Sequence, residues 1–484
     1  MTDVIKVEYV DDVNIRLICE PGIAQEVSDY FTFFVPGYKF MAKFKAKMWD
    51  GKIRLFNPFT CLLYGGLLRK LAKFCKDREY VLVIPKRFAD VKFEIKDAKS
   101  FVEDLAPTMT PHDHQYDAFI KAVQKRRALL LSPTSSGKSF IIYLLCMYYK
   151  VPTLIVVPTT SLVNQMYSDF EEYGLDSDRY VHKIYSGHDK NTDKPIVVTT
   201  WQSVYQLPQK WFSRYKLAIG DEAHGFKAKS LTSIMTKLVD CPYRIGLTGT
   251  LDGTETNELV LEGLFGPVHR VISTKELMDK GIVAKLSVEA IVLVYTDETK
   301  KHVSKHLTDY KDEIEFIVTC KARNEFIKKL ALSLKGNSLL LFQYVEKHGK
   351  VLYELIKAVT DRPVYFIAGE TDVDDRERIR KILETETDAI AICSSGTFST
   401  GVSVKNLHNV IFTSPSKSRI KVLQSIGRGL RVSKTKTEVT LYDLSDDLTW
   451  KSRENHTTRH FVERVKLYNE ENFDYRIHRV KLSA

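Results

Sequence analysis

The sequence predicts an α/β protein with two parallel-sheet lobes in tandem and a small α/β domain at the N-terminus. Apolar strand-like runs alternate with helical segments in two separate blocks, which is typical of mainly parallel sheets covered on both faces. A chain of 484 residues is long enough for two to four domains. We therefore divide it into an N-terminal domain (1–95), a first lobe (96–280), a second lobe (281–447) and a basic, helical C-terminal tail (448–484).

Composition places the chain among ordinary globular proteins, with 44% hydrophobic and 27% charged residues. No apolar run reaches membrane-spanning length and the first residues lack a signal-peptide pattern, so we expect no membrane partner and a cytoplasmic location. The seven cysteines form no CxxC pair, which argues against a zinc site or a disulfide framework. A net charge of +11 favours a polyanionic partner.

The N-terminal domain carries much of this charge. Residues 31–80 hold eleven Lys or Arg against three acids, and bases alternate with apolar residues from Tyr38 to Trp49. Period-two alternation predicts a strand with one basic face, formed by Lys39, Lys43, Lys45 and Lys47. Such a strip suits phosphate groups. An ordinary solvated strand face is the equal alternative.

Each lobe has its own set of predicted strands. In the first lobe they are Ala128–Leu131, Leu154–Val157, Ile196–Thr199, Leu217–Ile219 and Arg244–Leu247. In the second lobe they are Val288–Val294, Ser338–Phe342, Val364–Ile367, Ala389–Cys393, Val410–Thr413 and Val439–Tyr442.

A phosphate-sized loop follows the first of these strands. Residues 132–139 read Ser-Pro-Thr-Ser-Ser-Gly-Lys-Ser, directly before an apolar helix start. Gly137 lets the backbone approach phosphates, Lys138 can reach the β- and γ-phosphates, and the Ser139 hydroxyl can bind Mg²⁺. Such a loop usually opens with Gly, where this chain has Ser132, so a chance strand–turn–helix is the alternative.

Two acids end a later strand of the first lobe. Asp221 and Glu222 follow the apolar run that starts at Leu217. Parallel strands bind ligands at their carboxyl ends, so Asp221 is a candidate for the Mg²⁺ shell and Glu222 for polarising a water. The alternative is a solvated strand end that caps a helix.

In the second lobe, Gln424, Arg428 and Arg431 lie in a predicted helix. The two arginines are three residues apart and share a helix face. A phosphoryl group bound by the first lobe would satisfy both, as an arginine finger does. The alternative is a surface helix with solvated arginines.

Hydroxyl-rich segments end strands in both lobes. Short hydroxyl side chains and backbone amides there can hold a phosphodiester backbone without reading bases. Taken singly, each is more often a helix cap. The candidates are Thr159, Thr160, Thr200, Gln202, Thr371 and Thr400.

In this order the motifs resemble those of superfamily 2 helicases. The matching segments are His112–Gln115, Pro133–Ser139, Val157–Gln165, Val198–Ser203, Asp221–His224, Leu247–Thr250, Ser338–Tyr344, Ser399–Ser403 and Gln424–Arg431. The resemblance implies two RecA-like lobes with ATP and Mg²⁺ in the cleft between them. It implies adenine contact by Gln115 and phosphate contact by the loop residues Pro133, Thr134, Ser135, Ser136, Gly137, Lys138 and Ser139. Two positions depart from the usual pattern: His112 replaces a common arginine, and Ser403 replaces a common aspartate.

The fuller pattern, including Lys47–Leu55, is similar to phage recombination and repair helicases. That similarity implies a DNA-stimulated ATPase that remodels forks, four-way junctions and RNA–DNA hybrids, possible recombination or single-strand-binding accessory proteins, and a duplex-binding N-terminal domain. Trp49 and Arg54 then become candidate DNA contacts, with a core position as the alternative for Trp49. His224, next to the two acids, is a candidate to report the nucleotide state to Thr248 or Gln424, with a plain helix-start histidine as the alternative. A double-strand translocase that separates no strands, and a scaffold with a silent nucleotide site, remain open alternatives.

Overall fold

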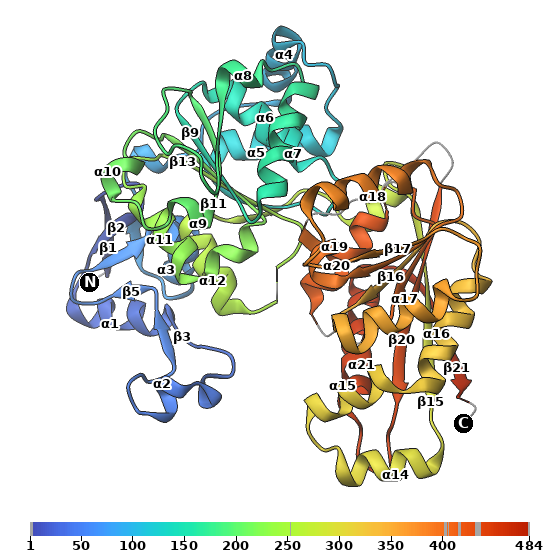
Figure 1. Ribbon diagram of the computed structural model, residues 1–484. Helices are drawn as coiled ribbons and strands as arrows, with labels where there is room; N and C mark the ends of the chain where they lie inside the picture. Colours follow the sequence, from blue (N-terminus) through green and yellow to red (C-terminus); the bar gives the residue numbers. More distant parts are fainter. Residues whose placement is uncertain are drawn as a thin grey trace. The chain divides into compact units, whose positions relative to one another are not determined.

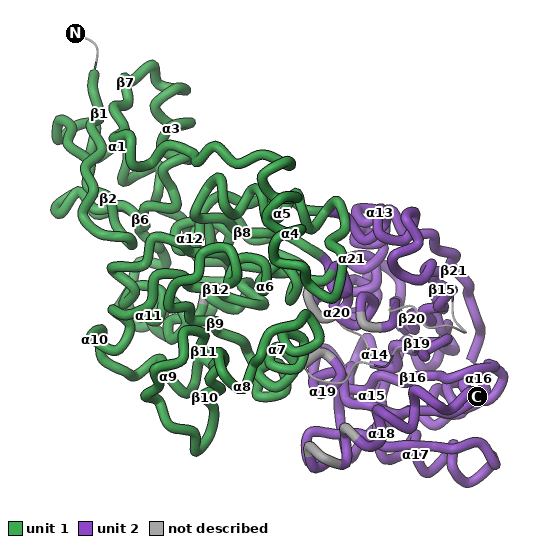
Figure 2. Tube along the Cα trace, turned by 90° about the horizontal axis from the view of Figure 1, so that it is seen from above, with its two compact units in different colours: residues 1–132, 137–271 green, residues 133–136, 272–484 purple. Residues whose placement is uncertain are grey.

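A computed structural model describes residues 3–251, 253–400, 404, 406–414, 418–430 and 437–482. Within these ranges some side chains, including those of Thr400 and Arg428, are also outside the described part. The chain forms two compact units, residues 1–132 with 137–271 and residues 133–136 with 272–484 (Figure 2). Figure 1 shows the sheets and the helices that cover them.

Unit 1 starts with a five-stranded sheet in the order β5-β6-β2-β1-β7. Its alternating strands turn Ile5 and Val7 inward, where they pack with Val27 and Leu71 of the covering helices α1 and α3. The elements are β1 (Val4–Tyr9), β2 (Asn14–Ile18), α1 (Pro21–Tyr30), β5 (Phe56–Asn57), β6 (Leu62–Tyr64), α3 (Leu68–Asp77) and β7 (Val81–Val83).

The predicted basic strand in this domain is wrong. A short 3-10 helix (η1, Tyr38–Phe40) and one helical turn (α2, Ala42–Lys45) lie between the paired strands β3 (Thr32–Phe34) and β4 (Lys52–Arg54). Phe40, Phe44 and Met48 are spaced four residues apart. Residues at this spacing share a face in a helix as well as in a strand. The Tyr38 ring stacks on Phe34 at 4.8 Å and meets Phe44 edge-on at 4.7 Å, which favours the compact turn. The lysines of the segment remain exposed.

The second sheet of unit 1 has seven strands, and all of its ladders are parallel. All five predicted strands are confirmed, and β10 and β14 are additional edge strands. The order is β10-β11-β9-β12-β13-β8-β14. The bounds are β8 (Arg127–Leu131), β9 (Thr153–Val157), β10 (Val181–Ile184), β11 (Ile196–Thr200), β12 (Leu217–Asp221), β13 (Tyr243–Thr248) and β14 (Val268–Arg270).

Helices cover both faces of this sheet, which explains its continuous apolar strands. Leu130 and its neighbours face one hydrophobic cluster, together with helices α4 to α7, whereas Leu129 faces a second cluster with α11 and α12. The helices are α4 (Ile95–Leu105), α5 (Asp113–Lys125), α6 (Lys138–Tyr149), α7 (Thr160–Glu172), α8 (Ser177–Tyr180), α9 (Trp201–Val204), α10 (Gln209–Phe212), α11 (Lys229–Lys237) and α12 (Glu255–Phe265).

Two buried arginines join the N-terminal sheet to the larger sheet of unit 1. Arg127 and Arg244, paired across β8 and β13, both donate to the backbone carbonyl of Asp12, at 3.1 and 3.0 Å. Further carbonyls, such as that of Leu264, accept from the same guanidinium groups. Burial and the neighbouring Arg244 lower the pKa of Arg127 to about 9. The β1–β2 turn is therefore held at the amino ends of two central strands.

Unit 2 contains a parallel seven-stranded sheet in the order β17-β18-β16-β19-β20-β15-β21. The strands are β15 (Lys285–Val294), β16 (Ser338–Phe342), β17 (Val364–Ile367), β18 (Ile390–Ser394), β19 (Asn409–Phe412), β20 (Glu438–Asp447) and β21 (Asp474–Lys481). The helices are α13 (Thr274–Asp279), α14 (Asp297–His306), α15 (Tyr310–Thr319), α16 (Lys321–Ser333), α17 (Lys350–Lys357), α18 (Val373–Thr385), α19 (Ser395–Thr400), α20 (Arg419–Gly429) and α21 (His456–Glu470). The two α/β lobes expected from the sequence are present.

The C-terminal tail was predicted to be helical, but it contains a strand as well as a helix. After α21 the chain forms β21, which pairs with β15 at the edge of the sheet. Arg464 on α21 binds the buried Asp443 of β20 at 2.9 and 3.0 Å, and Tyr468 donates to the same carboxylate at 2.9 Å. These charges lie in the interior, so the tail is an integral part of the second lobe.

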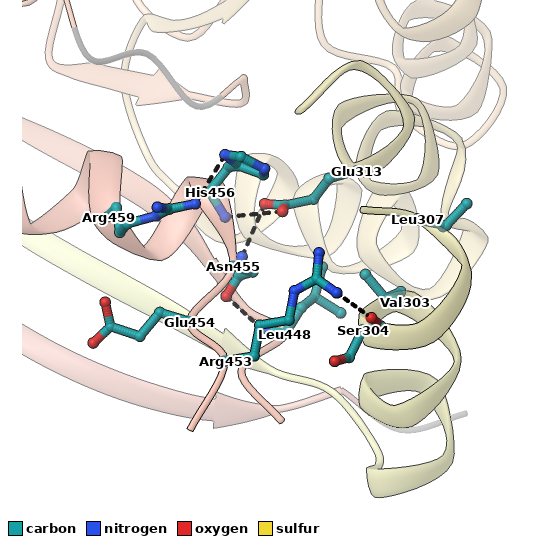
Figure 3. A pocket seen from close by; sticks show the side chains of 10 residues that line it. All are labelled: Val303, Ser304, Leu307, Glu313, Leu448, Arg453, Glu454, Asn455, His456 and Arg459. Atoms are coloured by element: carbon teal, nitrogen blue, oxygen red, sulfur yellow. Dashed lines mark hydrogen bonds between the residues drawn. The ribbon is translucent and has the colours of Figure 1, made fainter. Parts of the chain in front are cut away.

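A second buried acid fixes the start of α21. Glu313 is 2% exposed and accepts hydrogen bonds from the Asn455 side chain at 3.0 Å and from the His456 backbone N–H at 2.9 Å (Figure 3). It also accepts from the Thr457 backbone N–H at 2.8 Å. A carboxylate at a helix N-terminus satisfies donors that have no partner within the helix. This contact ties α15 to α21. In the described part of the chain, we find no helix with the length and apolar character that crossing a membrane requires.

Candidate functional site

Because every ladder of the larger sheet in unit 1 is parallel, all of its strands end at one edge. The strand order divides this edge into two neighbouring parts. The phosphate loop, the Asp-Glu pair and Thr248 follow β8, β12 and β13, which adjoin one another in the sheet. The hydroxyl-rich segments follow β9 and β11, which lie next to β10 on the other side.

The part of the edge that carries the phosphate loop and the two acids begins at the start of α6. Gly137, at φ 79°, immediately precedes this helix, so the backbone takes a left-handed turn that favours glycine. Lys138 Nζ lies 3.4 Å from the Ser132 carbonyl oxygen and 3.9 Å from Glu222 Oε1. Its side chain is 12% exposed. The structure thus brings together the cation and the acid that the sequence predicted for one site.

Asp221 is buried beside this pair. Its Oδ1 atom has no hydrogen-bond partner among the described residues. Burial, and then the charge of Glu222, raise the pKa of Asp221 to about 6, while Lys138 opposes the shift. A buried carboxylate oxygen without a donor is a suitable ligand for a hard cation, so the site fits Mg²⁺.

Ser139 is engaged elsewhere in this structure. Its hydroxyl is hydrogen-bonded to the Tyr173 hydroxyl at 2.8 Å. Tyr173, at the end of α7, was not predicted, and no motif of the sequence marks it. A hydroxyl has one O–H donor and two lone pairs, so Ser139 can donate to Tyr173 and keep a lone pair for a metal ion.

Glu222 and His224 link the acid pair to the next strand. Glu222 has a left-handed backbone at φ 51°, an unusual conformation for a side chain-bearing residue and one that recurs at functional sites. His224 Nδ1 lies 3.3 Å from Glu222 Oε2 and 2.9 Å from Thr248 Oγ1. Thr248 donates in turn to the Thr250 carbonyl at 3.0 Å. His224 therefore contacts Thr248, one of the two residues named for it, while its role in reporting the nucleotide state stays a prediction.

Gln115 lies against the phosphate loop. Its Oε1 accepts from the His112 backbone N–H at 2.8 Å, which completes the cap of α5, and its Nε2 lies 3.5 Å from the Gly137 carbonyl oxygen. A Cβ atom at Gly137 would lie 2.1 Å from Nε2 and would displace the Gln115 amide, and the φ of 79° disfavours any other residue there. Adenine contact by this amide stays a prediction.

The other predicted nucleotide residues are less completely described. Ser136 donates to the Pro133 carbonyl at 2.7 Å, and Ser135 has a φ of 70°, so the loop 133–136 is tightly turned. Thr134 is half-buried in the same loop. Gln424 is half-buried on α20. The side chain of Arg428 and all of Arg431 lie outside the described residues, so their role stays a prediction.

The second part of the edge is a groove of about 590 Å³. It contains four predicted residues, Thr159, Thr160, Thr200 and Gln202, and the structure therefore brings together segments that follow two strands. It also contains a loop after β10 that sequence reasoning missed. The complete lining is Pro158, Thr159, Thr160, Tyr185, Ser186, Gly187, His188, Lys190, Thr200, Gln202 and Ser203. Among the described residues, no carboxylate lines this groove.

The other predicted nucleic-acid residues do not line this groove. Thr371 follows β17 in unit 2, where its hydroxyl accepts from the Ala368 N–H at 3.0 Å. The Thr400 side chain is outside the described part. Trp49 is half-buried, neither core nor free platform, and donates to the Lys52 carbonyl at 2.8 Å. Arg54 pairs with Asp50 at 2.5 Å.

Comparisons with known proteins match the chain in three segments. Family models described as "DNA helicase UvsW, N-terminal", "Type III restriction enzyme, res subunit" and "Helicase conserved C-terminal domain" match residues 4–85, 108–253 and 322–433. The chain is 36% identical to the ATP-dependent DNA helicase uvsW of Enterobacteria phage T4, over 99% of this chain and 100% of that protein. It is 26% identical to the DNA 3'-5' translocase XPB2 of Sulfurisphaera tokodaii, over 66% and 78% of the two chains. The crystal structure of T4 UvsW matches at 34% identity and a TM-score of 0.53, over 99% and 100% of the chains.

Proposed function

The chain belongs to the UvsW family of superfamily 2 DNA helicases, and from this premise we propose how it acts and on what. It is an ATP-dependent DNA helicase or translocase. We propose branched DNA, meaning forks and four-way junctions, as its substrate, with RNA–DNA hybrids as a second one. Recombination or single-strand-binding proteins are proposed accessory partners, and the cytoplasm of an infected bacterium the proposed location.

The observation that carries the proposal is the division of one sheet edge. A lysine and two acids stand beside one another after β8 and β12, and an acid-free, hydroxyl-lined groove follows β9, β10 and β11. A triphosphate needs cations and a metal-binding carboxylate, whereas a phosphodiester backbone is held by hydroxyls and amides and repelled by carboxylates. The two parts of the edge match these two ligands.

Each residue of the nucleotide part has a separate proposed task. Lys138 binds the β- and γ-phosphates together with the N–H groups at the start of α6. Glu222, 3.9 Å from Lys138, orients a water toward the γ-phosphate. Ser139 and Asp221 would hold Mg²⁺, which neutralises charge on the phosphates when it is bound. Gln115 is proposed to bind adenine, and Arg428 and Arg431 to stabilise the transferred phosphoryl group.

The proposed nucleotide chemistry is tested most directly at Glu222. Glu222→Gln keeps the size of the side chain but removes the base. We expect ATP hydrolysis to fall by about 10²–10³-fold while ATP binding is retained, because a general base contributes about that factor. Glu289→Gln on β15 of unit 2 is the matched control. A Glu222→Gln variant with full turnover would remove this residue from the mechanism.

The substrate is tested with a panel of nucleic acids. Strand displacement should occur on naked forks, four-way junctions and RNA–DNA hybrids, with branched DNA preferred over blunt duplex. A chain that hydrolyses ATP and travels along duplex DNA but separates no strands would instead be a double-strand translocase. An absence of DNA-stimulated ATPase activity would leave only a nucleic-acid-binding scaffold.

The N-terminal domain is proposed to hold the duplex arm. Lys43, Lys45 and Lys47 are exposed on one short arm between β3 and β4. Replacing all three with alanine should weaken duplex binding and reduce its dependence on salt by about three released counterions. Replacing Lys96, Lys99 and Lys121, which lie on α4 and α5, is the control of equal charge. Equal losses in both triple variants would make the arm ordinary basic surface.

A further inference from the structure

The loop that follows β10 forms one wall of the groove and has a fixed shape. The His188 N–H donates to the Tyr185 carbonyl at 2.9 Å, so Tyr185–His188 is a tight turn. Gly187 has a φ of 84°, a value that suits the third position of a type II turn. The turn brings the Tyr185 and His188 rings together, with centroids 4.0 Å apart and planes tilted by 46°.

One contact holds the Tyr185 ring, and two more hold the backbone that follows the turn. The Tyr185 hydroxyl donates to Asn164 Oδ1 on α7 at 3.3 Å. Beyond the turn, the Asp189 carbonyl contacts His182 Nε2 at 2.8 Å, and the Lys190 carbonyl accepts from Trp211 Nε1 at 2.9 Å. Ring surfaces that are positioned before binding lose little conformational freedom when a ligand arrives.

The walls of the groove differ in chemistry. Thr159, Thr160 and Thr200 supply hydroxyls that suit phosphate oxygens, and the tight turn supplies two half-buried aromatic rings. Lys190 gives the groove its positive charge. A volume of about 590 Å³ lies within the range of pockets that enclose a small organic ligand, which includes one nucleotide.

We infer that Tyr185 and His188 form a stacking platform for one unpaired base of the strand that lies in this groove. The inference rests on the proposed function and makes it more specific. Backbone contacts alone would accept duplex and single strands alike, whereas a stacked base must have left its own helix. The groove therefore binds a single strand and reads the presence of a base, without preference for its identity.

The test combines changes in the protein with changes in the DNA. A single-stranded oligonucleotide of mixed sequence is prepared with one abasic site, placed at each position in turn. Binding of the full chain is measured by fluorescence anisotropy. For the unmodified protein, we expect one or two positions where loss of the base weakens binding about five- to tenfold, since stacking of a base contributes at least that factor.

His188→Ala should weaken binding of the intact strand by a similar factor, and the abasic site at the sensitive position should then cause no further loss. His188→Phe keeps a ring and should recover most of the affinity, which also shows that the turn still forms. His302→Ala, which changes an exposed histidine on α14 of unit 2, is the control and should bind like the unmodified protein.

Two results would overturn the platform. One is an abasic scan without a sensitive position; the other is a His188→Ala loss that is equal on intact and abasic strands, which would assign His188 to the backbone. Both results leave the helicase function intact, because DNA-stimulated ATP hydrolysis of the unmodified protein is measured in the same preparation. A chain that neither binds single strands nor hydrolyses ATP would contradict the proposed function itself.

Discussion

The two seven-stranded sheets have the same topology but different chemistry. In each, the seven strands taken in chain order occupy the same places, so that β8 corresponds to β15 and β12 to β19. After β8 come Gly137 and Lys138, whereas the helix after β15 is capped by the Thr296 hydroxyl at 3.3 Å from the Thr299 N–H. β12 ends in Asp221, whereas β19 is followed by Thr413, which donates to the Leu341 carbonyl at 2.8 Å. The fold supplies an edge, and a few end residues decide whether that edge can bind a triphosphate.

Buried charge differs between the sheets in the same way. In unit 2, Arg323 contacts Asp446 at 2.7 and 3.1 Å, and Asp443 binds Arg464, so these acids stabilise the fold. In unit 1, Asp221 keeps an oxygen without a donor among the described residues, at a cost to stability. One sheet uses its interior acids for packing, whereas the other leaves Asp221 Oδ1 without a donor among the described residues, which suits the Mg²⁺ role proposed for it.

The largest expected effect tests whether position or chemistry creates the nucleotide site. Lys138→Ala should lower DNA-stimulated ATP hydrolysis by about 10²–10³-fold or more, because a positioned charge that stabilises the transition state is lost. Lys300→Ala changes a lysine in the first turn of α14, the helix that follows β15, where it faces Asp447 at 3.9 Å. Its hydrolysis should stay within about twofold of the unmodified protein. Similar losses in both variants would contradict the division of labour between the sheets.

The next effect compares the two kinds of buried acid by calorimetric unfolding without nucleotide or metal. Asp446→Asn should destabilise unit 2 by about 3–5 kcal/mol, because the Arg323 charge is left buried without its partner. Asp221→Asn should instead stabilise unit 1 by about 1 kcal/mol, because a poorly solvated charge is removed.

The sign of the pH dependence follows from the raised pKa of Asp221. Its protonated form is favoured in the folded state, so the unmodified protein loses stability as the pH rises through about 6. The advantage of Asp221→Asn should therefore be present at pH 7 and vanish near pH 4. A destabilised Asp221→Asn protein at pH 7 would show that this carboxylate supports the fold.

The smallest effect compares two threonines at strand ends. Thr200 lines the groove and shares a 2.9 Å hydrogen bond with Ser203, whereas Thr413 is fully buried. Thr200→Val should weaken single-strand binding about two- to fivefold, with a loss of stability of at most about 1 kcal/mol from the hydrogen bond to Ser203. Thr413→Val should lower the free energy of unfolding by about 1 kcal/mol with unchanged binding. Exchanged outcomes would reverse the roles we assign to them.

In the two seven-stranded sheets, the sequence predicts the interior strands and the apolar edge strand β17 but misses the other three edge strands, for a physical reason. Central strands such as Leu154–Val157 are buried on both faces, so they read as unbroken apolar runs. The edge strands β10, β14 and β21 contain His, Lys or Arg, as in Val268–Arg270, and show no such run. The basic arm was mistaken because a spacing of four residues fits two periods, and only the contacts of Tyr38 distinguish them.

The same reasoning applies to the site. Lys138 and Glu222 are 84 residues apart in the chain, yet their proximity was predictable because parallel strands end together. The Ser139–Tyr173 bond and the ring pair of Tyr185 and His188 depend on how helix and loop ends meet, which no periodicity encodes. The sequence did contain a signal for this loop. Tyr185–His188 reads Tyr-Ser-Gly-His and directly follows the apolar Ile184, just as the other polar segments directly follow apolar strands.

The two hydrogen bonds that the Asp12 carbonyl accepts connect the N-terminal sheet to the strands of the nucleotide site. The guanidinium groups of Arg127, the first residue of β8, and Arg244, the second residue of β13, both donate to it. At their other ends, β8 leads to the phosphate loop and β13 ends at Thr248. If the proposed DNA arm moves the N-terminal sheet, β8 and β13, five and six residues long, would carry this displacement to the phosphate loop and to Thr248. Force on the DNA would then reach the nucleotide site through these two short strands.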